Sequence, residues 1–142
     1  MTIIHIVQCA GGVDRYLSML LPLLKKAGLQ QILICSFDYK KEEYKEKVDE
    51  IVQLNISHIS SNEKITQPVI IISKVYICCI NAGSLSMYFL RNIFSIRKLI
   101  KKYKPEIVYC HSSIAGGLGR LACLGLPTKI VYNPHGWACN MK

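Results

Sequence analysis

The sequence predicts an α/β fold in which a parallel β-sheet is covered by helices on both faces. Apolar runs rich in β-branched residues recur along the 142-residue chain, and amphipathic or charged segments separate them. These runs are continuous rather than alternating, which is typical of strands buried on both faces. Strands that alternate with helices form parallel sheets through right-handed crossovers. The length suits one domain with its own core, so we treat residues 1–142 as one domain.

The expected elements follow from these patterns in chain order. They are a strand at 2–9, a helix at 12–28, a strand at 31–37, a charged helix at 38–50, a strand at 51–59, an amphipathic helix at 85–104, a strand at 106–112, a helix opening from a Gly-rich loop within 113–126, and a strand at 128–132.

Helix and loop signals support the assignments between the strands. In 12–28, leucines recur at spacings of three and four, and Gly28 suits the helix end, whereas Pro22 predicts a kink. In 38–50, Glu43 and Lys47 form an i, i+4 pair, and Pro105 ends the helix at 85–104. Residues 60–68 read as a polar loop, and 69–83 fit a strand or a helix equally; 61–84 is therefore an atypical segment.

The charge and the cysteine content indicate in which cellular compartment the chain works and which partners it suits. The net charge is +9, and the seven cysteines are odd in number with no C-x-x-C pair, which favours a reduced, cytoplasmic chain. Residues 69–90 match a membrane span in length, but Lys74, Asn81 and Gly83 interrupt them, so we favour core strands.

Three unusual segments follow predicted strands and therefore share the carboxyl edge of the sheet, where ligands bind in open α/β folds. The first, Ala10–Gly12, offers bare backbone and a helix N-terminus to a phosphate or sugar hydroxyl; the alternative is a tight turn. Val13 and Tyr16 exclude a G-x-G-x-x-G dinucleotide fingerprint.

The second segment places His111 and Ser112 at a strand tip. Ligand contact and simple capping by Ser112 are both open, and the glycines at 116, 117 and 119 let the next helix approach the sheet. The third, NPHGW at 133–137, holds His135 between Pro134 and a glycine on a rim loop, which favours a site role. Trp137 is a stacking platform or a lid.

Two other site classes are disfavoured. Cys110, His111, His135 and Cys139 have the right atoms for zinc, but their spacing matches no zinc module and Cys110 should point away from His111, so we expect no metal and no cofactor. The basic helix lacks base-reading motifs, so we expect no nucleic acid. Its cations form either a solvated face or a patch for anionic lipid built from Arg97, Lys98, Lys101 and Lys102.

Three ordered motifs carry a family resemblance. GGVDRYLSMLL, LIKKYKPEIVYCHSSIAGGLGRLA and VYNPHGW together resemble the N-terminal domain of family 4 retaining glycosyltransferases of the GT-B fold, most closely bacterial enzymes of surface-polysaccharide assembly. The segment KYKPEIVYCHSS matches the family pattern K-P-D-I-V-H-x-H-S, with Glu106 for Asp and Tyr109 for His. The resemblance covers residues 1–60 and 85–142.

The resemblance implies a Rossmann-like domain that binds the acceptor and faces a donor-binding domain across a cleft. His135 would lie near the transferred sugar, with the substrate-binding residues Gly11, Gly12, Arg15, His111, Ser112 and Gly136 around it. The donor would be a nucleotide sugar, the acceptor a glycan or a lipid-linked glycan, and the transfer metal-independent. The basic face would dock at the cytoplasmic side of the plasma membrane.

The family's donor-binding domain is not recognised in this sequence, so we expect the 142 residues alone to be inactive. Two other functions stay open: a non-catalytic membrane-docking or binding module, and part of a nucleotide-sugar epimerase.

Overall fold

The computed structural model describes residues 1–7, 12–36, 41–54 and 85–135, and within these ranges it confirms the α/β fold. Five strands form one sheet in the order β3-β2-β1-β4-β5, and every neighbouring pair is parallel. The strands are β1 (Thr2–Val7), β2 (Gln30–Cys35), β3 (Glu50–Gln53), β4 (Ile107–Cys110) and β5 (Lys129–Tyr132).

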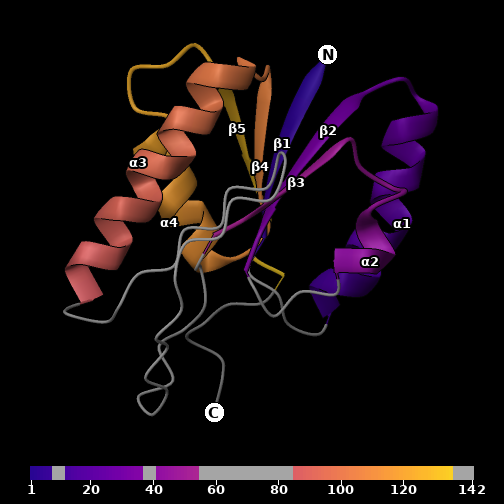
Figure 1. Cartoon of the computed structure of the whole chain (residues 1–142), viewed down its shortest axis with the longest axis horizontal. Coiled ribbons are helices and arrows are strands. Elements are labelled where there is room, and N and C mark those ends of the chain that lie inside the picture. The colour runs from indigo at the N-terminus through magenta and orange to yellow at the C-terminus, as the bar shows by residue number, and fades with distance from the viewer. Residues whose placement is uncertain (8–11, 37–40, 55–84, 136–142) are drawn as a thin grey trace.

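Helices cover both faces of the sheet, as Figure 1 shows: α1 and α2 lie on one side, α3 and α4 on the other. Their bounds are α1 (Gly12–Lys26), α2 (Lys41–Tyr44), α3 (Leu85–Tyr103) and α4 (Ser113–Ala122). Because the strands are parallel, all their carboxyl ends lie at one edge, towards the bottom of Figure 1, where α1 begins.

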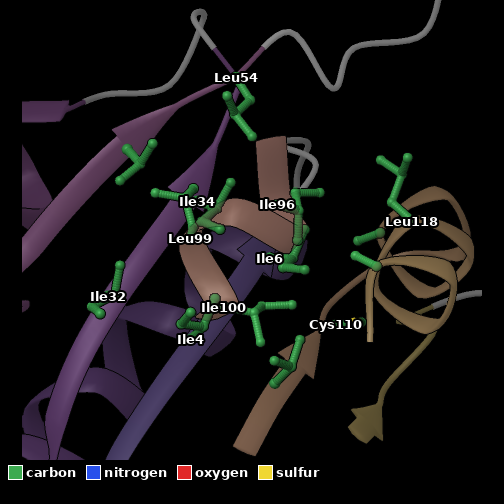
Figure 2. Close-up of a cluster of buried hydrophobic side chains, with 14 of the residues drawn as sticks. Ile4, Ile6, Ile32, Ile34, Leu54, Ile96, Leu99, Ile100, Cys110 and Leu118 are labelled. Atoms are coloured by element: carbon green, nitrogen blue, oxygen red, sulfur yellow. The ribbon is translucent and has the colours of Figure 1, made fainter. Parts of the chain in front are cut away.

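Each face of the sheet has its own apolar core, because successive side chains of a strand point to opposite faces. Figure 2 shows the larger core, in which Ile4, Ile6, Ile32 and Ile34 from the central strands pack against α3 and α4. The smaller core lies under α1 and α2 and consists of Val7, Val13, Leu17, Leu21, Leu33, Cys35, Tyr44, Val48 and Ile51.

Helix α1 continues through Pro22 as one uninterrupted element. It ends at Lys26, two residues before the end of the predicted 12–28, and Gly28 follows with a φ of +74° that suits glycine. The amide of Gly28 donates to the Lys25 carbonyl, and that of Leu29 donates to the Leu24 carbonyl. These bonds satisfy carbonyls of the last helical turn.

The prediction of a long helix over 38–50 is wrong for its described part. Helix α2 ends at Tyr44, and Glu50 already belongs to β3. The chain turns because Asp49 binds β2 twice: its amide donates to the Gln31 carbonyl, and its Oδ2 accepts from the Gln31 amide at 2.7 Å. A single i, i+4 charge pair contributes only about 0.2–0.5 kcal/mol to a helix, which is too little to oppose these bonds.

Strand β3 begins one residue before the predicted 51–59, and the part of that prediction from residue 55 lies outside the described residues, as does 61–84. Within the described ranges, no helix combines the length and hydrophobicity needed to cross a membrane. The greater part of 69–90 lies beyond those ranges.

Candidate functional site

The candidate site lies at the carboxyl edge, where β1, β4 and β5 end beside the N-terminus of α1. Backbone hydrogen bonds align the ends of these strands: the amide of His111 donates to the Ile6 carbonyl, and the amide of Asn133 donates to the Cys110 carbonyl. Residues that are far apart in sequence are therefore fixed side by side at one edge.

Three imidazoles stand in a line across this edge. His5 comes from β1, His111 directly follows β4, and His135 follows β5. His5 Nδ1 lies 3.1 Å from His111 Nε2, and His111 Nδ1 lies 3.4 Å from His135 Nε2. We call His5, His111 and His135 the histidine row. It runs from the fully buried sheet interior to the half-buried rim.

Two tyrosines pack against the histidine row. The rings of Tyr109 and His111 stack with centroids 4.1 Å apart, and Tyr16 meets His135 edge-on at 4.7 Å. The two hydroxyls lie 2.8 Å apart. This hydrogen bond and burial raise the pKa of Tyr16 to about 12, so the Tyr16 hydroxyl stays protonated at neutral pH. Tyr16 thus links the start of α1 to the rim loop after β5.

His135 is held in an unusual backbone conformation. Its φ is +51°, in the left-handed region that costs an L-residue free energy. Its amide donates to Oδ1 of Asn133 at 3.3 Å, an Asx-type contact that supports such turns. With the contacts to Tyr16 and His111, this fixes the imidazole at the rim.

Burial keeps the histidine row neutral. It lowers the pKa of His5 to about 4, and Gln31 only partly offsets this effect. Burial, with the nearby His5 and His135, lowers the pKa of His111 to about 3. Partial burial also lowers the pKa of His135. At neutral pH each imidazole therefore carries one proton and can donate one hydrogen bond and accept another.

Ser112 caps α4, which is one of the two roles that the sequence left open for it, the other being ligand contact. Its Oγ accepts a hydrogen bond from the Ala115 amide at 3.1 Å. Gly12 and Arg15 lie exposed on the first turn of α1. Among the described residues, none has a heavy atom within 4 Å of a Cβ placed on Gly12, so packing against them does not explain the glycine. Gly11, Gly136 and Trp137 lie outside the described residues.

Three of the four residues weighed for zinc lie in the described part of the chain, and Cys139 lies outside it. The Cys110 side chain packs into the core on the opposite face of the sheet from His111, and burial raises the pKa of its thiol to about 12. Within the described ranges, no three His, Cys, Asp or Glu side chains are arranged to hold a metal ion.

The four cations predicted to bind lipid separate into two groups. Arg97 Nη1 donates to the carbonyls of Ala122 and Leu124, at 2.9 and 2.6 Å, so Arg97 has a structural role at the end of α4. Lys98, Lys101 and Lys102 are exposed on α3, where Lys102 Nζ donates to the Tyr103 hydroxyl at 2.6 Å. The lipid assignment of these three lysines stays a prediction.

Sequence reasoning missed His5 and gave Tyr16 and Tyr109 no role in the site. His5 lies in a run of apolar residues, where it reads as one more core position. Strand alternation places Ile3, His5 and Val7 on the same face, and the register pairs His5 with Tyr109. This pairing would have revealed the cluster once β1 and β4 were known to be neighbours.

A profile described as Glycosyltransferase Family 4 matches residues 10–140. The chain belongs to this family. The five-stranded sheet corresponds to one Rossmann-like half of the two-domain GT-B enzymes, which agrees with the resemblance in the sequence. No curated protein sequence matches the chain.

Solved structures share the fold at low sequence identity. A glycosyltransferase from Rickettsia africae superposes with a TM-score of 0.64 at 21% identity, covering 99% of this chain and 31% of that one. The lipopolysaccharide outer core galactosyltransferase WaaB, in its apo form, superposes at 0.65 and 16% identity, covering 100% and 35%. A UDP-N-acetylglucosamine 2-epimerase, described as putative, from Listeria monocytogenes gives 0.57 and 12% identity, covering 92% and 30%. The chain thus spans about one third of the length of these relatives.

Proposed function

We propose that this family 4 domain forms the acceptor side of a retaining glycosyltransferase, which moves a sugar from a nucleotide sugar to a glycan or a lipid-linked glycan in polysaccharide biosynthesis. The observation that carries the proposal is the fixed position of His135 at the carboxyl edge. The imidazole is held by His111, Tyr16 and Asn133 rather than left to rotate on a surface loop. A rigid polar group at this edge is suited to bind a sugar hydroxyl.

The start of α1 supplies the second part of the proposed site. Its first amides are unsatisfied within the helix and point towards the carboxyl edge, where the helix dipole favours negative charge. Gly12 is exposed and adds no side chain beside these amides, and Arg15 adds an exposed cation on the same turn. In the proposal these groups face the diphosphate of the donor, on which negative charge develops as the sugar leaves.

Sugar transfer needs more of the cleft than this chain supplies. The solved relatives are about three times as long, and the proposal assigns the binding of the nucleotide to the remainder of such an enzyme. We therefore expect the purified 142-residue chain to show no transferase turnover, and we expect turnover only together with a donor-binding domain. Turnover by the chain alone would contradict this division of roles.

His135→Ala tests the proposal in that reconstituted enzyme. Loss of one positioned polar group at a reacting centre lowers kcat by roughly 10²-fold, and we expect an effect of this size in a radiolabelled sugar-transfer assay. The matched control is Lys129→Ala, an exposed residue at the opposite end of β5, which should leave kcat unchanged. Equal kcat for His135→Ala and the native enzyme would remove His135 from the site.

An epimerase is the second candidate, because UDP-N-acetylglucosamine 2-epimerases share the fold with TM-scores such as 0.57 and 0.60. The two reactions differ in their need for an acceptor. An epimerase would invert C2 of the sugar in a nucleotide sugar without any acceptor, and proton NMR of the sugar would show it. The non-catalytic alternative predicts neither reaction in the reconstituted enzyme.

The membrane part of the proposal rests on α3. Lys98 and Lys101 are exposed on this helix, as is Phe94 with 68% of its surface accessible. Cations beside an apolar ring suit the headgroup region of an anionic bilayer. In the proposal the domain works at the cytoplasmic face of the plasma membrane on lipid-linked acceptors.

A further inference from the structure

The side chain of Gln31, from β2, is fully buried. Its Nε2 donates to the Leu21 carbonyl at 2.9 Å and to the Lys47 carbonyl at 3.5 Å. These two acceptors fix the orientation of the amide, because the flipped amide would place its oxygen against both carbonyl oxygens. Gln31 Oε1 is therefore the acceptor that this side chain offers to the interior.

Gln31 Oε1 and His5 Nε2 are the two buried side-chain polar atoms without a hydrogen-bond partner in the described part of the chain. They belong to neighbouring strands: Ile3 pairs with Gln31, so His5 lies two residues further along on the same face. The Gln31 side chain also raises the pKa of His5, so it lies near enough to the ring to favour its protonated form. A proton on His5 Nε2 would make that atom a donor, so the two atoms could serve as partners for each other. A proton on Nδ1 would leave two buried acceptors unpaired, at about 1–3 kcal/mol each.

That proton sets the direction of the whole histidine row. With Nε2 of His5 protonated, Nδ1 of the neutral ring is an acceptor, so Nε2 of His111 carries the proton of the 3.1 Å contact. Nδ1 of His111 is then an acceptor in its turn, and Nε2 of His135 donates across the 3.4 Å contact. The remaining nitrogen of the row, Nδ1 of His135, keeps its lone pair.

We infer that Gln31 acts through His5 and His111 as a positioning residue, which fixes His135 as the Nε2–H tautomer and presents its bare Nδ1 at the carboxyl edge. His135 is then a hydrogen-bond acceptor there. This deepens the proposed function and rests on it in one respect: the ligand of that lone pair is a hydroxyl of the sugar. The tautomers themselves follow from the buried contacts and need no ligand.

The alternative arrangement reverses every bond in the row. His5 Nδ1 would then donate to His111, His111 Nδ1 would donate to His135, and His135 would present an N–H to the edge. Such a site would favour an acceptor atom, such as a phosphate oxygen, over a hydroxyl proton. The direction of the row thus decides the chemical group that the edge selects.

Nitrogen-15 NMR of the histidine rings in the full chain at neutral pH tests the inference, because long-range correlations to the ring protons distinguish the two tautomers. We expect the Nε2–H form for His5, His111 and His135. The Nδ1–H form at either His111 or His135 would overturn the inference.

Gln31→Met tests the role of the buried amide. It removes the acceptor for His5 at similar volume, and we expect the ratio of Nε2–H to Nδ1–H at His111 to fall roughly tenfold, the factor that corresponds to one hydrogen bond. The matched control is Gln53→Met, which removes a buried glutamine from the neighbouring strand β3 and should leave the ratio unchanged. An unchanged ratio in Gln31→Met, or an equal fall in the control, would overturn the inference.

A second variant covers the case in which Gln31→Met does not fold. His5→Phe keeps the ring contact with His111 but removes its acceptor, and it should lower the same ratio by a similar factor; an unchanged ratio would overturn the inference. These readouts need no substrate. If the inferred tautomers are found but His135→Ala does not change sugar transfer, the proposed function alone is refuted. If His135→Ala lowers sugar transfer but the tautomers differ, the inference alone is refuted.

Discussion

At the scale of single residues, the histidine row links the site to the stability of the domain. His5 and His111 pack into the fold as neutral rings, with pKa values lowered from 6.5 to about 4 and about 3. Below pH 6.5 the unfolded chain therefore binds more protons than the folded chain. Their contribution to stability is complete above that pH and is lost as the pH falls towards the folded values.

Chemical denaturation at two pH values measures this effect. Between about pH 7.5 and about pH 5, each histidine should lower the free energy of unfolding by on the order of 2 kcal/mol. His111→Phe preserves a ring beside Tyr109 and should remove about half of the pH-dependent loss. Equal stability of the native chain at both pH values would show that the two rings are not buried as neutral groups.

Some residues of the candidate site could be predicted from the sequence, and others could not. His111 and His135 were predicted because each follows a strand, and such positions share one edge of a parallel sheet. Gln31 and His5 read as ordinary strand residues. Their pairing depends on strand neighbours and register, which local sequence patterns do not contain.

At the scale of elements, the glycines of α4 act through packing. A Cβ at Gly119 would overlap the Cys110 Sγ atom, whereas one at Gly117 would meet, within the described part of the chain, only Phe89 Cζ at 3.9 Å. The close approach that the sequence predicted for this helix is thus required at Gly119 and not at Gly117.

Two alanine substitutions on this one helix should therefore act in opposite directions. Gly119→Ala should lower the free energy of unfolding by roughly 1–3 kcal/mol through overpacking. Gly117→Ala should raise it by up to about 1 kcal/mol through helix propensity. Urea unfolding midpoints measure both changes, and a shift in the same direction for both variants would contradict the packing described here.

Helix α3 carries the electrostatic prediction. Each lysine near an anionic surface contributes about 1 kcal/mol, so the double change Lys98→Gln and Lys101→Gln should weaken binding to anionic liposomes at least tenfold. The control with Lys26→Gln and Lys129→Gln has the same net charge, with its changes on α1 and β5, and should bind like the native chain.

Co-sedimentation at rising salt completes this test, because screening weakens attraction between exposed charges. Arg97→Gln should instead destabilise the fold, since its carbonyl partners at the end of α4 would lose their donor. Equal loss of binding in the control double variant, or binding that ignores salt, would refute a specific role for α3.

Element boundaries were predicted well where local signals decide them and poorly where tertiary contacts do. The ends of α1 and α3 follow from Gly28 and Pro105. The segment after α2 follows from hydrogen bonds between Asp49 and β2, which no charge pattern within 38–50 reveals.

At the scale of the whole molecule, the fold class follows from the alternation of buried strands and amphipathic helices, and the family match agrees with it. Alternation alone does not give the order β3-β2-β1-β4-β5. That order makes β1 the central strand, and it brings the ends of β1, β4 and β5 together at the carboxyl edge. The histidine row exists because of this arrangement.

Sugar binding at the carboxyl edge is measured most directly by an amide NMR titration of the labelled chain with methyl hexosides and methyl N-acetylhexosaminides. We expect saturable shifts concentrated at Gly12, Arg15, His111, Ser112 and His135, and weaker binding in His135→Ala. Saturable shifts elsewhere, or none at this edge for any glycoside of the panel, would contradict this expectation.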